Sequence, residues 1–181
     1  MDKLINNKLT DKNTVHSYLP VYEILFKDRK DTAENILEIG VFSGGSIDLW
    51  YKYFTKAKIY GYDIYLERNM VKENERIKFY QCDAYDTYFA KNHTEKFDII
   101  IDDGPHTLLS MIRFLLYYIP LLTEKGIAII EDVQSLEWVL IFNTIIEEQY
   151  PELKKCVLVC DLRKKKNRSD DIMYIIDKSR L

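Results

Sequence analysis

Acidic side chains and one histidine follow directly after two apolar runs of this sequence. "FDIIIDDGPH" passes without a spacer from four large hydrophobes to Asp102, Asp103 and His106, and "IIEDV" presents Glu131 and Asp132. Like charges crowded together raise one another's pKa unless a cation compensates them. Oxygen ligands from Asp and Glu favour a hard divalent ion such as Mg²⁺. The four carboxylates therefore predict a metal site, and the alternative is that some of them cap the helices that follow.

His106 stands three residues after Asp103, behind a Gly-Pro turn and at the start of a helical pattern. A lone histidine at a helix start is more often structural than catalytic. Beside a metal site, however, it becomes a candidate general base for a hydroxyl that the metal has made more acidic. We predict this catalytic role.

A glycine-rich turn follows the first predicted strand, where "EIGVFSGGS" carries Glu38, Gly40, Gly44 and Ser46. Glycines permit close approach of a ligand to the backbone, and a helix start offers free N–H groups. Three residues separate Gly40 from Gly44, which departs from the G-x-G-x-x-G pattern of dinucleotide-binding turns. The Glu38 carboxylate repels phosphate and suits a cationic or hydrogen-bond-donating ligand.

The next two predicted strands also end in carboxylates. Asp63 lies twenty-five residues after Glu38, where a carboxylate accepts hydrogen bonds from both hydroxyls of a ribose. "CDAYD" places Asp83 at the end of the third strand, in position to accept from an adenine amino group. Ligands of open α/β sheets bind outside the carboxyl ends of the strands. The three acidic strand ends therefore predict a ligand that contains a ribose and an adenine.

These residues need a sheet that brings the strand ends to one edge. Short apolar runs alternate with longer segments of helical spacing, and four runs are nearly continuous apolar, as in a parallel sheet covered on both faces. The pattern predicts a doubly wound, Rossmann-like α/β fold with seven mostly parallel strands and a C-terminal antiparallel hairpin around "RKKKNRSD". The predicted strands are residues 35–41, 58–64, 77–83, 97–103, 126–133, 156–162 and 171–177.

Helical spacing marks the crossover segments "GGSIDLWYKYFTK", "HTLLSMIRFLLYYIPLL" and "SLEWVLIFNTIIEEQY". Another amphipathic helix is expected over residues 13–30, lying over one end of the sheet. Because 181 residues suit one core, we treat residues 1–181 as a single domain. It divides into an N-terminal helical cap (1–34) and an α/β core (35–181).

Composition restricts the class of protein. The chain is 47% hydrophobic and 30% charged, as in soluble globular proteins, and no run approaches the roughly eighteen apolar residues that span a bilayer. A net charge of −3 argues against a nucleic-acid partner. Three cysteines form no even disulfide framework and are expected to be reduced thiols. With a polar N-terminus, we expect a cytoplasmic protein without a membrane or nucleic-acid partner.

The motifs "EIGVFSGGS", "GYDI" and "CDAYD" resemble the cofactor motifs of class I S-adenosylmethionine-dependent methyltransferases. The resemblance implies that the loop from Gly40 to Ser46, with Ser43 and Gly44, wraps the methionine part of the cofactor. It also implies that Asp63 binds the ribose and that Asp83 with Ala84 meets the adenine. Glu38 and Asp102 are assigned to the same cofactor site, although Asp102 either orients the methionine end or only shapes its turn.

"IDDGPH" followed by "IIEDV" resembles the macrocin and mycinamicin sugar O-methyltransferases and the related cephalosporin hydroxylase family. Carried over by position, the resemblance implies Asp103, Glu131 and Asp132 as the metal ligands and His106 as the base. It implies direct transfer of a methyl group to a sugar hydroxyl of a glycan, a sugar nucleotide or a glycosylated small molecule. The leading "DKNTVHSYLPVYEILF" is similar as well. The resemblance implies that four of its residues border the cofactor or acceptor: Thr14, His16, Ser17 and Tyr18. For His16, simple helix packing is an equal alternative.

The macrolide enzymes have a large additional N-terminal domain, whereas this sequence has some thirty residues before its first strand. We therefore expect the leading helix and the hairpin loop, or a second subunit, to complete the acceptor pocket, and we favour a homodimer. The basic run "RKKKNR" (163–168) either touches an acidic acceptor or is a solvated hairpin tip.

Three other functions stay open from the sequence. A catechol-type or polyketide phenol also presents two vicinal oxygens to a metal. A non-catalytic S-adenosylmethionine-binding protein would keep the cofactor pocket without needing a metal site. A metal-dependent hydrolase or hydroxylase would form product without S-adenosylmethionine.

Overall fold

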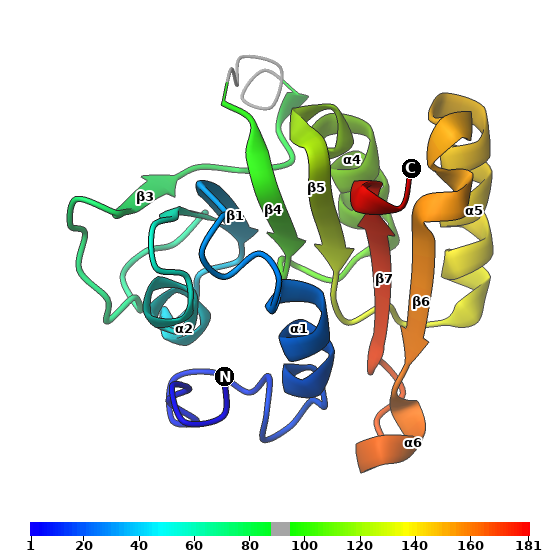
Figure 1. The fold of residues 1–181 in the computed structure, drawn as a ribbon. Helices are drawn as coiled ribbons and strands as arrows, with labels where there is room; N and C mark the ends of the chain where they lie inside the picture. The colour runs from blue at the N-terminus through cyan, green and yellow to red at the C-terminus, as the bar shows by residue number, and fades with distance from the viewer. Residues whose placement is uncertain (88–94) are drawn as a thin grey trace.

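The computed structural model describes residues 1–87 and 95–181. Its centre is a seven-stranded sheet with the strand order β3-β2-β1-β4-β5-β7-β6 (Figure 1). The strands are β1 (Asn35–Ile39), β2 (Lys58–Asp63), β3 (Ile77–Gln81), β4 (Phe97–Asp102), β5 (Leu122–Ile130), β6 (Val157–Asp161) and β7 (Ile172–Asp177). All seven predicted strands are present, which confirms the predicted fold class.

Five strands are parallel and the last two form the expected hairpin. Strands β1 to β5 pair in parallel, whereas β7 pairs antiparallel with both β5 and β6. The hairpin connection contains the one-turn helix α6 (Arg163–Lys166). Strand order reverses between β1 and β4, so this point of the carboxyl edge is where an open α/β sheet binds its ligands.

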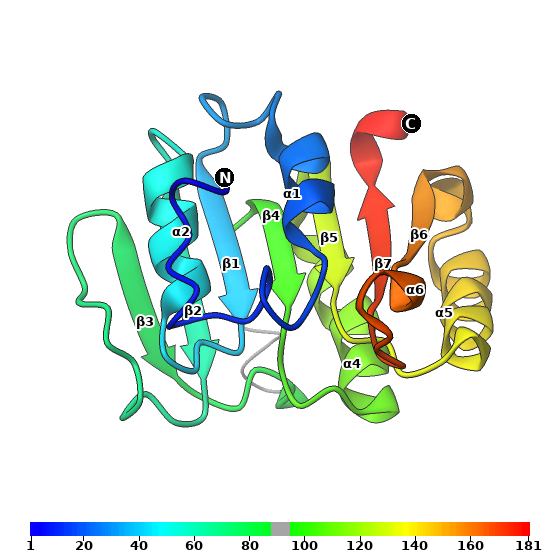
Figure 2. The ribbon, with the colours of Figure 1, turned by 90° about the horizontal axis from the view of Figure 1, so that it is seen from below.

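Helices cover both faces of the sheet. One core cluster joins α1 (Leu19–Phe26) and α2 (Gly45–Tyr53) to one face, and a second joins α4 (Leu108–Tyr118) and α5 (Leu136–Gln149) to the other. Figure 2 shows α1 and α2 drawn over the strands. The described residues also contain short 3-10 turns: Ile119–Leu121, Pro151–Cys156 and Lys178–Arg180. Because both faces are covered, strands β1, β4 and β7 are buried nearly throughout.

The first helix differs from its prediction in length and in place. We expected a helix over residues 13–30, but α1 spans only Leu19–Phe26, and turns precede it. Pro20 stands in its first turn, where the missing N–H of proline costs no helical hydrogen bond. Tyr22 and Phe26 pack against Trp50 of α2. The helix therefore covers a face of the sheet rather than one end.

Residues 1–18 form the N-terminal segment, which runs past the carboxyl ends of β1 and β4 (Figures 1 and 2). Lys166 of α6 fixes this segment, because its ammonium donates to the carbonyl oxygens of Asn13, Thr14 and His16, the last at 2.6 Å. Among the described residues, no helix combines the length and the apolar content needed to cross a bilayer.

Candidate active site

A cavity of about 830 Å³ opens at the carboxyl edge, beside the point where strand order reverses. That volume suits a drug-sized ligand or cofactor. The N-terminal segment forms one wall through residues 7–11 and Thr14. Nine of the residues that the sequence predicted for the site line the cavity: Thr14, Gly40, Ser46, Asp63, Asp83, Ala84, Asp103, His106 and Asp132.

The glycine turn after β1 is held against the end of β2. Asp63 accepts hydrogen bonds from the backbone N–H groups of Val41 at 2.8 Å and Phe42 at 3.0 Å, and from Tyr65 at 2.9 Å. Gly40 has a φ of +91°, and a Cβ at this position would collide with the backbone oxygen of Asp103. Glycine is therefore required where the turn passes β4. Asp63 shapes this turn and still faces the cavity.

The end of β3 adds a second acidic corner. The Asp83 carboxylate accepts from the backbone N–H of Tyr85 at 2.9 Å, and Asp83 and Ala84 both line the cavity. Tyr118 of α4 donates to the carbonyl oxygen of Ala84 at 2.6 Å, which fixes this corner from below. Two carboxylates, Asp63 and Asp83, thus face one end of the cavity from neighbouring strands.

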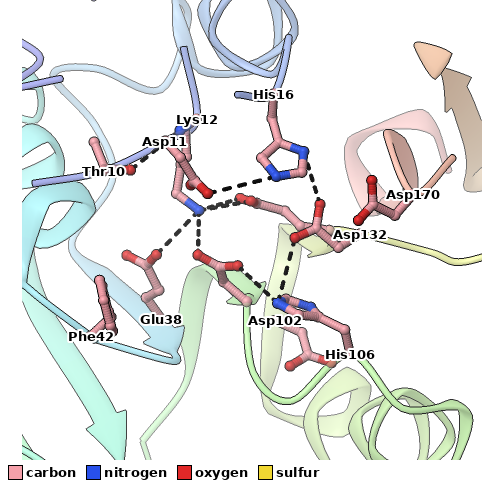
Figure 3. Close-up of polar contacts among 12 residues, drawn as sticks. Thr10, Asp11, Lys12, His16, Glu38, Phe42, Asp102, His106, Asp132 and Asp170 are labelled. Carbon is pink, nitrogen blue, oxygen red and sulfur yellow. Dashed lines mark hydrogen bonds and ion pairs between the residues drawn. The ribbon is translucent and has the colours of Figure 1, made fainter. Parts of the chain in front are cut away.

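Asp103, His106 and Asp132 converge at the other end of the cavity. His106 Nε2 lies 3.8 Å from Asp103 Oδ1 and 3.5 Å from Asp132 Oδ2. One potential ligand atom from each residue lies within 4.8 Å of the others. Figure 3 shows the imidazole of His106 facing the carboxylate of Asp132. This group therefore combines carboxylate oxygens, which are ligands for a divalent ion, with an imidazole nitrogen, which can accept a proton.

The backbone is strained at this end of the cavity. His106 and Asp132 have positive φ values of 52° and 53°, and Phe42 in the glycine turn at the opposite end has a φ of 46°. Non-glycine residues seldom adopt this conformation, and where they do it often marks a functional site. At Asp132 this left-handed backbone conformation changes the direction of the chain after β5. The Asp132 side chain therefore faces the cavity.

Lys12 holds the acidic cluster together from the N-terminal segment. Its Nζ lies 2.7 Å from both carboxylate oxygens of Glu131, 2.7 Å from Asp103 Oδ2 and 3.5 Å from Glu38 Oε1 (Figure 3). The Lys12 side chain is only 1% exposed. Burial lowers the pKa of Lys12, but the charges of Asp103, Glu131 and Glu38 together raise it well above its usual value. Lys12 is therefore a charged ammonium inside the protein.

Glu38 and Glu131 lie behind the cavity wall formed by the described residues. The indole N–H of Trp50 donates to Glu38 at 2.7 Å, and burial raises the pKa of Glu38 to about 7. The hydroxyl of Tyr22 donates to Glu131. Burial raises the pKa of Glu131, although the charge of Lys12 acts to lower it. The sequence predicted that Glu38 suits a cationic or hydrogen-bond-donating ligand in the cofactor site. The structure instead buries Glu38 away from the cavity lining, against the chain's own Lys12 and Trp50.

Tyr18 and His16 support Asp132 from behind. The Tyr18 hydroxyl donates to Asp132 Oδ1 and stands 3.2 Å from the backbone nitrogen of Asp132. His16 Nδ1 lies 3.2 Å from Asp132 and 3.3 Å from Asp171. Burial raises the pKa of Asp132, and the charge of Asp103 adds to this. The motif "TVHSY" thus reaches the acidic cluster, where His16 packs inside and Thr14 faces the cavity.

Asp102 points to the opposite face of the sheet from Asp103. Its carboxylate accepts from the Tyr85 hydroxyl and is 2% exposed. Burial raises the pKa of Asp102 to about 6, although the hydrogen bond from Tyr85 opposes this. Asp102 therefore lies beneath the cavity and shapes the turn toward His106. Ser43 and Gly44 lie in the turn itself, where Gly44 has a φ of +80° and caps α2.

Two curated relatives identify the kind of protein. The chain is 30% identical to 8-demethyl-8-alpha-L-rhamnosyl tetracenomycin-C 2'-O-methyltransferase of Streptomyces olivaceus, over 71% of the chain and 36% of that enzyme. It is 31% identical to mycinamicin VI 2''-O-methyltransferase of Micromonospora griseorubida, over 68% and 33% of the two chains. The chain is a relative of these sugar O-methyltransferases. No family model matches the chain.

A solved structure extends this relationship to the fold. MycE, a methyltransferase of the mycinamycin biosynthetic pathway solved in complex with Mg and SAH, superposes with a TM-score of 0.69 and 23% identity. The superposition covers 92% of this chain and 51% of MycE. This sugar O-methyltransferase relative thus has the methyltransferase fold, which confirms the resemblance that its motifs indicated. The chain spans about a third of the length of the two curated relatives.

The donor groups of this sugar O-methyltransferase relative fit a divalent ion at one place in the cavity. Two ligands on opposite sides of Mg²⁺ lie about 4 Å apart, since each bond is about 2.1 Å. The facing atoms of Asp103 and Asp132, beside His106, lie within 4.8 Å, so small side-chain rotations suffice. Glu131, the third ligand that the resemblance implied, instead directs both oxygens at Lys12. At the other end, the glycine turn, Asp63 and Asp83 fit a nucleoside cofactor.

Several residues of the site were missed by the sequence reasoning. Lys12 and Tyr22 hold Glu131, Tyr85 holds Asp102, and Arg113 lines the cavity from α4. The sequence offered one signal for Lys12, since four predicted strand-end carboxylates need compensating positive charge and this lysine lies in the leading motif. The sequence contains no pattern that would predict contact between Lys12 and these carboxylates.

Proposed function

We propose that this chain is an S-adenosylmethionine-dependent and divalent-metal-dependent O-methyltransferase that acts on a sugar hydroxyl. One observation carries the proposal: a single cavity has two nucleoside-type carboxylates, Asp63 and Asp83, at one end and Asp103, Asp132 and His106 at the other. Relatives named as sugar O-methyltransferases support the reaction and the acceptor class.

The cofactor end of the cavity is built for S-adenosylmethionine, which supplies the methyl group when bound. We assign the loop from Gly40 to Ser46 to its methionine part, because the glycine at position 40 lets the backbone approach closely. Asp63 has acceptor capacity beyond the three backbone N–H groups that it binds, and this remaining capacity suits ribose hydroxyls. Asp83 and Ala84 stand at the adenine position.

At the other end, Asp103 and Asp132 would hold a divalent ion, which would supply the acidification of a neighbouring hydroxyl. His106 accepts the hydroxyl proton at Nε2, which faces the cavity between the two aspartates. Their carboxylates stabilise the imidazolium that forms. Tyr18 and His16 orient Asp132 for this task. The N-terminal segment covers one side of the cavity.

A transfer assay tests the proposal. The purified chain is incubated with methyl-labelled S-adenosylmethionine, Mg²⁺ and a panel of free sugars, sugar nucleotides, glycosylated small molecules and catechols. Label is expected in a sugar hydroxyl. Cofactor binding without transfer to any acceptor would support a non-catalytic binding protein. Product that forms without S-adenosylmethionine would support a hydrolase or hydroxylase.

A catechol-type phenol is the second candidate acceptor. Leu109 of α4 lines the cavity one turn after His106 and is 57% exposed, which gives a flat aromatic ring an apolar surface. Methyl transfer to a catechol in preference to every sugar would favour this acceptor.

We also propose that two copies associate and that the chain works in the cytoplasm without a nucleic-acid or membrane partner. Leu136, Leu140 and Ile141 of α5 are exposed and supply an apolar surface for self-association. The three cysteines are free thiols, which suits a reducing compartment. Light scattering is expected to give twice the mass of one chain. The mass of one chain at every protein concentration would contradict the association.

A further inference from the structure

Lys12 uses all of its hydrogen-bonding capacity on one side of the acidic cluster. An ammonium has three N–H donors, and the Lys12 Nζ has three carboxylate oxygens at 2.7 Å, two on Glu131 and one on Asp103. Glu38 Oε1 lies 3.5 Å away on the same side. The ammonium is thus a fixed part of the protein interior rather than a mobile surface charge.

In this arrangement Glu131 is directed at Lys12 and does not line the cavity. Both of its oxygens face Lys12, and Oε1 also accepts the hydrogen bond from Tyr22. The Glu131 side chain is 2% exposed, whereas those of Asp103 and Asp132 are 25% and 10% exposed. A metal ion in the cavity therefore meets the two aspartates, and it reaches Glu131 only if Lys12 is displaced.

The charges of the cluster leave room for a second cation beside Lys12. Glu38, Asp103, Glu131 and Asp132 carry four negative charges when ionised, and Lys12 compensates one of them. A divalent ion would bring the cluster close to neutrality. Mg²⁺ commonly binds through one or two carboxylates, with water or substrate in the remaining positions. Asp103 Oδ1 and Asp132 Oδ2, which both face His106, supply such a pair.

We propose that Lys12 is a permanent internal cation that removes Glu131 from the metal's ligand set and leaves the divalent ion to Asp103 and Asp132. The inference rests on the proposed metal-dependent function. It divides the acidic cluster into a lysine side and a metal side, with Asp103 contributing one oxygen to each. Glu131 is then a structural carboxylate that anchors the N-terminal segment over the cavity.

Direct titration with Mn²⁺, followed by electron paramagnetic resonance, separates the two sides. Asp132→Asn is expected to weaken Mn²⁺ binding at least about tenfold, while Glu131→Gln changes it by less than about twofold. Lys12→Met frees Glu131 as an additional ligand and is expected to tighten Mn²⁺ binding about tenfold. Lys166→Met is the matched control, because it removes a lysine that holds the same segment without touching the carboxylates. The control is expected to bind Mn²⁺ as the unmodified chain does.

Equal loss of Mn²⁺ binding in Glu131→Gln and Asp132→Asn would overturn the inference. If the unmodified chain binds no Mn²⁺, the metal-dependent function fails, and the pairing of Lys12 with Glu131 is then tested by melting temperature in EDTA. Lys12→Met alone is expected to lower the melting temperature by about 10 °C, because it leaves buried carboxylates without their cation. The double variant with Glu131→Gln should recover part of this loss. Purely additive losses would show that the two side chains do not act as a pair.

Discussion

Asp102→Asn is expected to stabilise the protein at neutral pH but not at acidic pH. Burial raises the pKa of Asp102 from its ordinary 3.8 to about 6. The folded chain therefore binds this proton more tightly than the unfolded chain does. The protonated carboxyl contributes its full stability below about pH 4, and this contribution is lost as the pH rises through about 6. The difference between 3.8 and about 6 corresponds to about 3 kcal/mol, at 1.36 kcal/mol for each pH unit.

Asparagine keeps the shape of Asp102 and an oxygen that accepts the hydrogen bond from Tyr85, without the buried charge. We expect a gain of about 1–3 kcal/mol in the free energy of unfolding at pH 8, shrinking to about zero near pH 4. Urea denaturation at several pH values measures it. Asp28→Asn, at an exposed aspartate, controls for the loss of one negative charge. A pH-independent change, or a loss of stability at pH 8, would refute the assignment of Asp102 to a buried structural site.

Three other substitutions test the site. Asp63→Ala should abolish S-adenosylmethionine binding in calorimetry, because it removes the acceptor for the ribose and the anchor of the glycine turn; retained affinity would place the ribose elsewhere. His106→Ala should lower turnover about 10²-fold to 10⁴-fold in the transfer assay with cofactor binding retained, and unchanged turnover would move the base to another residue. Gly40→Ala should lower the free energy of unfolding by about 1–3 kcal/mol in urea, since its φ of +91° strains a side chain and the new Cβ meets Asp103; an unchanged midpoint would mean that the turn relaxes.

The strand ends were predictable because two simple rules determine them. Continuous apolar runs located β1, β4 and β5, and parallel pairing brings their carboxyl ends to one edge. Side chains also alternate between the faces of a strand. Asp103 continues the face of Ile99 and Ile101, whereas Asp102 continues the face of Ile100. The sequence left the role of Asp102 open, and this alternation already assigns it to the face away from Asp103.

The contacts of Lys12 depend on tertiary structure and were not predictable in the same way. No periodic pattern covers residues 1–12. The N-terminal segment folds through turns in which the carbonyl oxygens of Asp11 and Lys12 accept hydrogen bonds. Its position is fixed by remote groups, namely the carboxylates at the sheet edge and Lys166 of α6. The basic run 163–168 was expected to touch an acidic acceptor or to be a solvated hairpin tip. Its residues 164–167 are exposed, and Lys166 also binds backbone oxygens of the N-terminal segment.

The overextended helix prediction has a local cause. Apolar residues at helical spacing over 13–30 favoured one long helix, but Tyr18 and His16 belong to the acidic cluster rather than to a helix face. Polar demands of the site thus override helical periodicity before Leu19. Functional segments are where local rules of sequence are expected to fail.

The central claim is metal-dependent methyl transfer from S-adenosylmethionine to a sugar hydroxyl in this cavity. The most direct test measures labelled methyl transfer to a sugar acceptor before EDTA, after EDTA and after addition of excess Mg²⁺. We predict transfer that EDTA abolishes and Mg²⁺ restores, and Asp132→Asn should remain inactive at the same Mg²⁺ concentration. Transfer that continues unchanged in EDTA, or that Asp132→Asn supports as well as the unmodified chain, would contradict the account.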